Sequence, residues 1–183
     1  RMIEHYISEE KFREGVSRYL ERYSYKNAAA EDLWNSLAKV SSVPVREVMQ
    51  AWIKQTGYPV IEASLEGNKL KFSQTRLING KGDKRLWKVP LVIRLYSEGK
   101  EETVKFLLSK REDTLILKKI PYAFNLNYLR TGFYRVKYPK ENLERLKKLI
   151  TQKSIDSIDR FSVQEDLFRL CVLGKLSLDY YLD

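Results

Sequence analysis

Few side chains in this sequence could hold a metal ion or act as a nucleophile. The 183 residues include one histidine, His5, and one cysteine, Cys171, at opposite ends of the chain. A catalytic zinc ion takes about three protein ligands that converge at bonding distance. Because these two residues do not form such a set, we predict no metal site and no catalytic residue in this chain. His5 fits the surface of a helix, and Cys171 fits the apolar stripe of another.

Other catalytic motifs are absent from the sequence as well. There is no H-E-x-x-H pair, and nothing completes a Ser-His-Asp arrangement. The stretch NGKGDK, residues 79–84, lacks the capped helix that follows a phosphate-binding loop, so we interpret it as a flexible connection between strands. Adjacent acids, as in Glu31-Asp32 and Glu165-Asp166, point in different directions on a helix. We interpret both pairs as surface residues or complements of the helix dipole, not as acid/base pairs.

The chain is basic, with 34 Lys and Arg against 24 Asp and Glu and a net charge of +10. Most basic residues alternate with apolar ones or stand beside acids, as in KENLERLKK, which is typical of a solvated surface. An alternative function remains open: an independent basic β-module that binds single-stranded nucleic acid. Its basic contacts would be Lys71, Arg76, Lys81, Lys84, Arg85 and Lys88, with Phe72 and Trp87 stacking on bases.

The single cysteine excludes a disulfide within the chain and fits a reducing compartment. No secretory segment opens the sequence, and no apolar run reaches the roughly 20 residues that cross a bilayer. We therefore expect a soluble, cytoplasmic protein with no membrane partner.

The first third of the sequence has the apolar spacing of helices over residues 8–23, 30–40 and 44–55. Ser8 is the expected N-cap of the first, and Gly57 followed by Pro59 ends the last. The side chains expected to face inward are Phe12, Val16, Tyr19, Leu20, Tyr23, Leu33, Trp34, Leu37, Val40, Val45, Val48, Met49, Trp52 and Ile53.

From Pro59 the period becomes that of strands. Gly67-Asn68 and Gly99-Lys100 predict two hairpins, and further short strands follow up to residue 138. Six or seven strands without an intervening helix predict a small antiparallel β-sandwich, with Pro90 at an edge strand or a bulge. Alternation is expected to bury Leu70, Phe72, Leu86, Val89, Leu91, Ile93, Leu95 and Phe133, together with one tyrosine of GFYRVKY. It is expected to leave Arg135 and Lys137 in solvent.

After Pro139 the period is helical again, up to Gly174, and a last helix is expected from Ser177. The expected inward stripe consists of Leu143, Leu146, Leu149, Ile150, Ile158, Phe161, Leu167, Phe168, Cys171 and Val172. The predicted fold class is therefore a multi-part α+β protein: helices, then a sandwich of about six or seven strands, then helices. That order suggests a slice through several domains. We expect Met2, Ile3, Tyr6, Tyr180, Tyr181 and Leu182 to lie uncovered at its two ends.

Four blocks of the sequence carry a family resemblance: NAAAEDLWNSL, VREVMQAWIKQTGYPVI, LNYLRTGFYRVKY and DRFSVQEDLFRLCVLGKL. In this order and spacing they resemble the zinc aminopeptidases that include aminopeptidase N, puromycin-sensitive aminopeptidase and the archaeal tricorn-interacting factors. The most specific residues are Asp32-Leu33-Trp34, Trp52, Gln55, Gly57-Tyr58-Pro59, Gly132 to Val136, Tyr138, Asp159-Arg160, Asp166, Phe168, Gly174 and Leu176. The sequence departs from the family pattern at Ala30, Lys137 and Phe161, where Thr, Asn and Ala are usual.

The resemblance implies a place within a larger zinc enzyme that removes N-terminal residues from peptides. Residues 1–57 would be the closing helices of a thermolysin-like catalytic domain, 58–139 a β-sandwich spacer, and 140–183 the first helices of a C-terminal domain. The zinc ligands and catalytic groups of that family precede the segment that this sequence resembles. We therefore expect a structural, non-catalytic portion, whose partners are the rest of the parent polypeptide and the parent's peptide substrates.

Overall fold

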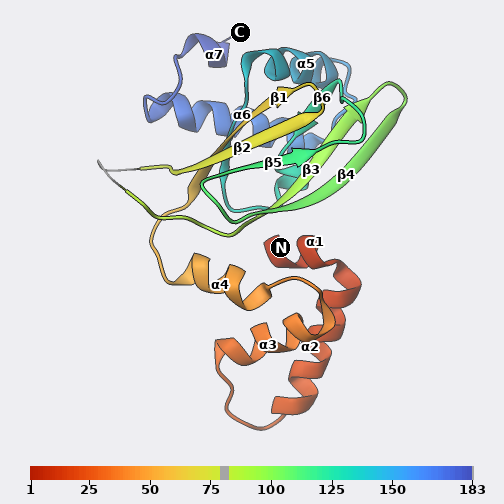
Figure 1. The fold of residues 1–183 in the computed structure, drawn as a ribbon, viewed down its shortest axis with the longest axis vertical. Coiled ribbons are helices and arrows are strands. Elements are labelled where there is room, and N and C mark those ends of the chain that lie inside the picture. The colour runs from red at the N-terminus through yellow and green to blue at the C-terminus, as the bar shows by residue number, and fades with distance from the viewer. Residues whose placement is uncertain (79–82, 183) are drawn as a thin grey trace.

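The computed structural model describes residues 1–78 and 83–182. Four helices open the chain and lie together at one end of the elongated molecule (Figure 1). They are α1 (Met2–Ile7), α2 (Glu9–Tyr23), α3 (Ala30–Val40) and α4 (Val45–Ile53). The three predicted helices are therefore present, and α1 precedes them. Ser8 separates α1 from α2 with a φ of 100°, and its hydroxyl accepts the Lys11 N–H at 3.4 Å, as expected of an N-cap.

The four helices share an apolar cluster that includes Ile3, Ile7, Trp34 and Leu37, with Val45 and Val48 wholly buried. Two of the predicted inward positions are wrong. Leu20 of α2 and Ile53 of α4 are each 60% exposed. Ile3 was expected to lie uncovered, but it packs inside this cluster at 8% exposure.

The border between helices and strands is formed by the end of α4 and the segment after it. α4 ends at Ile53, a few residues before the predicted stop, and Gly57 then adopts a left-handed φ of 90°. Two side chains hold this border against the chain before the third strand. Trp52 donates its indole N–H to the Lys88 carbonyl at 2.9 Å, and Gln55 donates to the Leu86 carbonyl at 2.9 Å. The helical part is thereby fixed on the sandwich.

Within the described ranges, seven strands form two facing sheets. The strands are β1 (Pro59–Glu66), β2 (Lys69–Arg76), β3 (Val89–Ser97), β4 (Lys100–Leu108), β5 (Glu112–Ile116), β6 (Ala123–Asn125) and β7 (Arg135–Lys137). One sheet has the order β5-β2-β1-β7 and the other β4-β3-β6. The described part of the chain thus confirms an α+β architecture with a central sandwich. The sheets are mostly antiparallel, and the exception is β7, which pairs with β1 in parallel.

Both predicted hairpins are present, with Gly67 and Gly99 at left-handed φ values of 57° and 64°. The second turn is one residue earlier than predicted, because Lys100 already belongs to β4. Pro90 causes no bulge, since the β3-β4 register continues from Val89↔Leu108 to Ser97↔Lys100. β3 is the central strand of its sheet, so the predicted edge strand is wrong as well. Pro90 is accommodated because β6 pairs only with residues 94–96 of β3.

The sandwich core contains the predicted inward residues of β2 and β3, and Leu70, Val89, Leu91 and Ile93 are wholly buried. Leu86 and Phe133 were predicted to be buried and are not, with exposures of 36% and 64%. Phe133 precedes β7, which begins at Arg135, so strand alternation does not apply to it, whereas the adjacent Tyr134 is 3% exposed.

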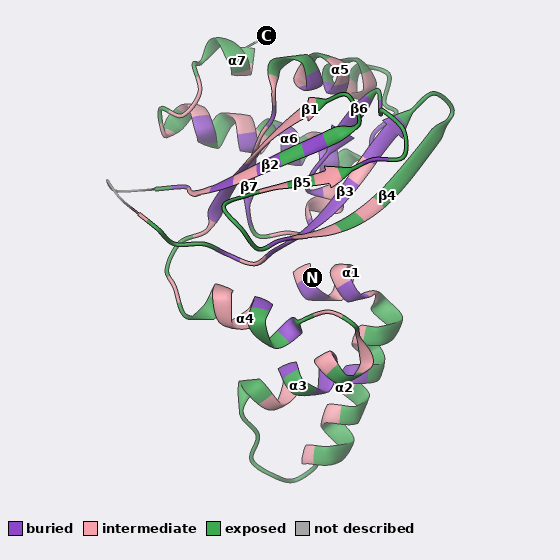
Figure 2. Ribbon diagram, in the orientation of Figure 1, coloured by how far each residue is buried: buried purple, intermediate pink, exposed green. Residues whose placement is uncertain are grey.

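Three helices close the chain on the opposite side of the sandwich from α1–α4: α5 (Lys140–Thr151), α6 (Ser157–Val172) and α7 (Asp179–Leu182) (Figure 1). Gly174, with φ 64°, follows the end of α6 as predicted. The predicted inward stripe of α6 is wrong at three positions: Phe161, Phe168 and Val172 are at least half exposed. α6 instead buries Asp159, Ser162, Val163, Asp166 and Leu170 (Figure 2). At the far end Tyr180 and Leu182 are exposed, as expected.

Candidate functional site

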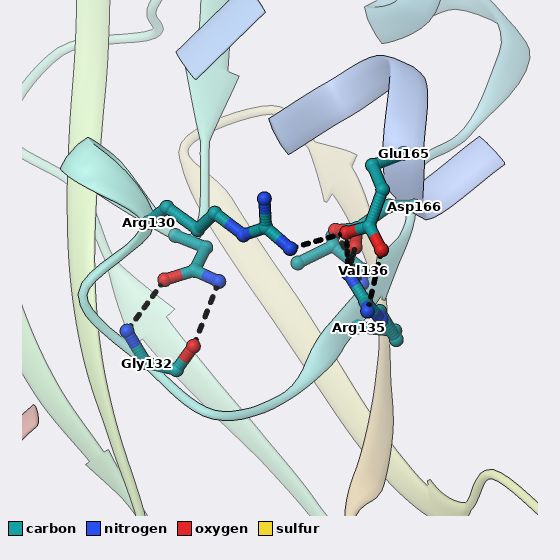
Figure 3. A network of polar contacts seen from close by, with 7 residues as sticks. Arg130, Gly132, Arg135, Val136, Glu165 and Asp166 are labelled. Carbon is teal, nitrogen blue, oxygen red and sulfur yellow. Dashed lines mark hydrogen bonds and ion pairs between the residues drawn. The ribbon is translucent and has the colours of Figure 1, made fainter. Parts of the chain in front are cut away.

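The acidic face of α6 meets strand β7 in a buried ionic contact (Figure 3). Arg135 donates to Asp166 Oδ1 at 3.0 Å and to Glu165 Oε1 at 2.8 Å, and it makes a second contact with Glu165 Oε2. The N–H of Val136 completes the arrangement with a 3.0 Å hydrogen bond to Asp166 Oδ2. The interpretation of Glu165-Asp166 as a surface pair is therefore wrong, because both carboxylates reach the same guanidinium. Arg135 was also predicted to face solvent, yet its side chain is only 14% exposed.

A second arginine extends this contact along α6. Arg130 donates to Glu165 Oε2 at 2.5 Å, and its guanidinium lies 4.8 Å from the centre of the Phe161 ring. Arg130 and the preceding Leu129 both have left-handed backbone angles, with φ values of 49° and 54°. Such angles are unfavourable for residues with a side chain, so the surrounding contacts must hold this turn in place.

Asp159 precedes Glu165 on α6 and supports the backbone turn formed by Leu129 and Arg130. Its Oδ1 accepts the Leu129 N–H at 2.6 Å, and the residue is wholly buried. The other end of the turn is closed by Asn127 and Gly132, which exchange hydrogen bonds of 2.8 and 3.2 Å (Figure 3). We call residues 127–137 the joint segment, because its turn and strand β7 receive all of these carboxylates.

Burial raises the pKa values of the two aspartates of α6 that contact the joint segment. It raises the pKa of Asp166 to about 7, although the hydrogen bonds and charge of Arg135 act in the opposite direction. Burial also raises the pKa of Asp159 to about 6, against the lowering effect of the Leu129 N–H and the Asn125 amide. For Arg135, desolvation favours the neutral form, but the hydrogen bonds that it donates to Glu165 and Asp166 outweigh this effect. Its pKa is raised above the usual range, and the guanidinium stays charged.

The joint segment also reaches the helices at the other end of the molecule. The Phe133 ring lies 6.3 Å from Trp52 and 5.0 Å from Tyr58, measured between ring centres. Arg1 donates to the Leu129 carbonyl at 3.0 Å. Segment 127–137 therefore touches α6 on one side and the border after α4 on the other. Chemically the arrangement is a fastening between elements, with no nucleophile or open substrate position at its centre.

His5 and Cys171, the two side chains considered as zinc ligands, are engaged in local contacts. His5 lies in the last turn of α1, where its Nδ1 is 3.1 Å from the Arg1 carbonyl, and the Cys171 thiol donates to the Ser177 carbonyl at 3.3 Å. Within residues 1–78 and 83–182 no three His, Cys, Asp or Glu side chains gather to hold a metal ion. In the same ranges, no helix has both the length and the apolar character to cross a membrane.

The side chains proposed for nucleic-acid binding do not form a binding face. Phe72 and Trp87 are 2% and 1% exposed, so neither ring is available for stacking. Most of the basic residues have acidic partners, and Lys84 is exposed. The pairs are Lys71–Glu66, Arg76–Asp83, Arg85–Asp83 and Lys88–Glu47. Lys81 and most of the NGKGDK stretch lie outside the described residues.

The contact between Arg135, Glu165 and Asp166 was not predicted from the sequence. One signal was present: Asp159, Ser162, Val163, Asp166 and Leu170 follow helical spacing and define a face that mixes acids with apolar residues. Only a partner with donors could bury such a face. Sequence spacing does not show that the donors come from residues about thirty positions earlier.

Comparison with known proteins gives two family matches, one toward each end of the chain. The Peptidase family M1 domain matches residues 1–52, and the ERAP1-like C-terminal domain matches residues 123–183. The intervening part contains most of the sandwich.

Individual relatives match over nearly the whole chain. It is 35% identical over 186 residues to aminopeptidase M1-A of Oryza sativa subsp. japonica, covering 97% of this chain and 21% of the relative. It is 34% identical over 182 residues to leucyl aminopeptidase of Saccharolobus solfataricus, covering 99% of this chain and 22% of the relative. It is 34% identical over 183 residues to tricorn protease-interacting factor F2 of Thermoplasma acidophilum, covering 100% and 22%. The chain thus spans about a fifth of the length of these relatives.

Proposed function

We propose, from the premise that this chain belongs to the family of the M1 aminopeptidases, that it is a non-catalytic, connecting portion of a larger zinc aminopeptidase. The parent enzyme would remove N-terminal residues from peptides. Zinc would polarise the peptide carbonyl and activate water there, held by residues outside this chain. The residues of this chain bind and orient structural elements, and no step of the reaction is assigned to them.

The proposed division has three parts. Residues 1–57 would close the catalytic domain, 58–139 would form the spacer, and 140–183 would open the C-terminal helical domain. The change from helix to strand after α4 and from strand to helix after β7 supports these limits. The first family match ends at residue 52, which agrees with the first limit. The second match begins at residue 123, within the sandwich, so β6 and β7 have sequence features shared with the C-terminal domain.

The observation that carries the proposal is the ionic contact between Arg135 and the Glu165-Asp166 pair. A buried charge cluster of this kind fixes the direction of α6 relative to the sandwich, because a shifted helix would leave charges buried without partners. The function of this segment would then be to set where the C-terminal helices stand over the active site of the parent. We further propose that the parent works in the cytoplasm, and that its partners are peptides and not nucleic acid.

The test compares this chain with the full-length polypeptide that contains it. With zinc supplied, we expect this chain alone to hydrolyse no aminoacyl anilide above background, and the full-length protein to do so with chelator-sensitive turnover. Turnover by the chain alone that a chelator removes, and that survives repurification, would contradict the proposal.

A variant of the full-length protein tests the connecting role. Arg135→Met is expected to change the KM for peptides more than the KM for a small anilide, because only peptides extend toward the C-terminal helices. Lys71→Met is the control, since the Lys71–Glu66 pair is exposed. Equal effects of the two variants on both substrates would argue against a role for the joint.

A further inference from the structure

The joint holds more buried negative charge than its cations balance. Asp159 and Asp166 are 0% and 2% exposed, and Glu165 lies beside them. The ion pairs of the joint use Arg130 and Arg135, and both arginines contact Glu165. Among the described residues, Asp159 has no cation within ion-pair distance. A buried carboxylate without a counter-ion is costly, and it is relieved by taking up a proton.

Asp159 also makes few hydrogen bonds for a buried carboxyl group. Oδ1 accepts one backbone N–H, from Leu129, while Oδ2 is a buried atom without a hydrogen-bond partner. The Asn125 amide is a second donor that faces Asp159 and lowers its pKa, but its buried nitrogen makes no hydrogen bond of normal geometry. Asp159 thus has one short hydrogen bond and no ion pair to offset its burial.

We propose that docking of helix α6 on the joint segment depends on a bound proton. Asp159 is a neutral carboxylic acid while α6 is docked, and its ionisation loosens α6. This goes beyond the proposed function, because it concerns a regulatory property of the fold and holds whatever reaction the parent catalyses. No oxidant or cofactor takes part, since the step is the transfer of one proton between a carboxyl group and solvent.

The groups that face the two buried acids come from every neighbouring element. Asp159 faces Asn125 of β6 and the Leu129 N–H, with the charges of Arg94 and Asp156 acting on it from β3 and the start of α6. It in turn raises the pKa of Tyr96 on β3, which burial places far above neutral pH, and it also acts on Tyr128 of the joint segment.

Asp166 faces Arg135 and the Val136 N–H of β7, with Glu165 acting on it from α6. Its charge acts on Tyr134 and Tyr138, whose pKa values burial raises well above neutral. The carboxyl groups of Asp159 and Asp166 are therefore the groups at this contact whose charge changes near neutral pH.

The sign of the effect follows from linkage. When α6 is docked, the pKa of Asp159 is about 6 and that of Asp166 about 7, whereas the ordinary value for both is 3.8. The docked state therefore holds more protons than the undocked state between about pH 4 and 7, so raising the pH through this range favours undocking. Docking is firmest at the acidic end of the window and weakest above about pH 7. Asp32 and Asp83 have lowered pKa values, so they titrate below this window.

Hydrogen exchange on the full chain measures the docking equilibrium. After correction for the intrinsic exchange rate, we expect the opening equilibrium of α6 and of the Leu129 amide to rise at least about tenfold from pH 5.5 to 8, since one pKa unit corresponds to a tenfold change. Amides in the β3-β4 hairpin serve as the internal control. Asp159→Asn, which resembles the neutral acid, should keep α6 docked and make the pH dependence smaller, and the remainder should come from Asp166, whose raised pKa the variant leaves in place. His5→Asn is the matched control, because it removes the sole imidazole, a group that ordinarily titrates near neutral pH.

A second measurement uses the unaltered chain, so it does not depend on whether a variant folds. The carboxyl carbon of Asp159 in the unaltered chain, followed by NMR, should titrate near pH 6 and well above 3.8. A carboxyl that titrates at its ordinary value overturns the proposal. An α6 opening equilibrium that does not change between pH 5.5 and 8 overturns it as well, and so does a dependence that Asp159→Asn leaves intact.

Discussion

Arg135 and Asp166 are thirty-one positions apart in the chain, yet the guanidinium donates to the carboxylate at 3.0 Å with both side chains largely withdrawn from water. The same carboxylate accepts the N–H of the residue after Arg135. Asp166 thus binds a side chain and a backbone group from one strand, and so fixes both the position and the direction of α6 on β7. Opposite charges that meet in this way stabilise a joint only when neither is left alone.

Removal of Arg135 should therefore be costly. Arg135→Met leaves Asp166 buried without its cation, and we expect the free energy of unfolding to fall by about 3–5 kcal/mol at pH 8. At pH 5.5 the loss should be smaller, because Asp166 can then accept a proton. Urea unfolding at both pH values measures the difference. Arg46→Met, which breaks the exposed Arg46–Glu31 pair, should cost less than about 1 kcal/mol at either pH. Equal losses in the two variants would mean that the joint contributes no more than a surface pair.

Much of the architecture was predictable from local sequence. Period and turn residues predicted the helices, both hairpins and the sandwich, because these features depend on neighbours a few positions apart. The joint depends on contacts between β7 and α6, which local spacing does not encode. The parallel pairing of β7 with β1 was missed for the same reason.

The face that α6 buries shows where such reasoning fails. Counting apolar residues favoured Phe161 and Phe168, but the structure buries Asp159 and Asp166 instead. An aspartate is expected on a surface unless it has partners, and the partners here are backbone N–H groups and Arg135, which no pattern within the helix reveals.

Gly57, between α4 and β1, should tolerate no side chain. Its φ is 90°, and a Cβ at this position would lie 2.8 Å from Nε of Arg76, a side chain held by Asp83 and Thr56. We expect Gly57→Ala to destabilise the fold by about 2–3 kcal/mol, from the left-handed angle together with the displaced arginine. Gly67→Ala is the matched control, because Gly67 has a φ of 57° with open space around it, and it should cost about 1 kcal/mol. Thermal unfolding of the two variants gives the comparison, and a Gly57→Ala loss no larger than that of Gly67→Ala would show that Arg76 moves freely.

Trp52 should matter more than its neighbour Ile53. Trp52 contacts both apolar clusters and donates its indole N–H to the Lys88 carbonyl. Trp52→Phe keeps an aromatic ring but removes this donor, so we expect a loss of about 1–2 kcal/mol in urea unfolding. Ile53→Ala, at a position 60% exposed, should change stability by less than about 0.5 kcal/mol. If the two substitutions cost the same, Trp52 does not fasten α4 to the sandwich.

The buried side-chain amides of Gln74 and Asn142 form hydrogen bonds with backbone groups that have no partner in a neighbouring strand. Gln74 accepts the Trp87 N–H at 2.9 Å and donates to the carbonyls of Trp87 and Lys110 at 2.9 and 2.8 Å. Asn142 accepts the Phe124 N–H at 3.0 Å and donates to the Phe124 carbonyl at 2.9 Å, which makes it a substitute for a neighbouring strand along β6. Both side chains are at most 4% exposed, so water does not replace them easily.

Replacing either amide with leucine should leave buried backbone groups without partners. We expect Gln74→Leu and Asn142→Leu each to lower the free energy of unfolding by about 2–4 kcal/mol, since each unpaired buried group costs about 1–3 kcal/mol. Asn142→Asp separates the two halves of the interaction, because an ionised carboxylate still accepts the Phe124 N–H but cannot donate to its carbonyl. Hydrogen exchange should then show the Phe124 amide less protected in Asn142→Leu than in Asn142→Asp at equal global stability. Full protection of that amide in Asn142→Leu would mean that another acceptor replaces the side chain, and that β6 does not need it.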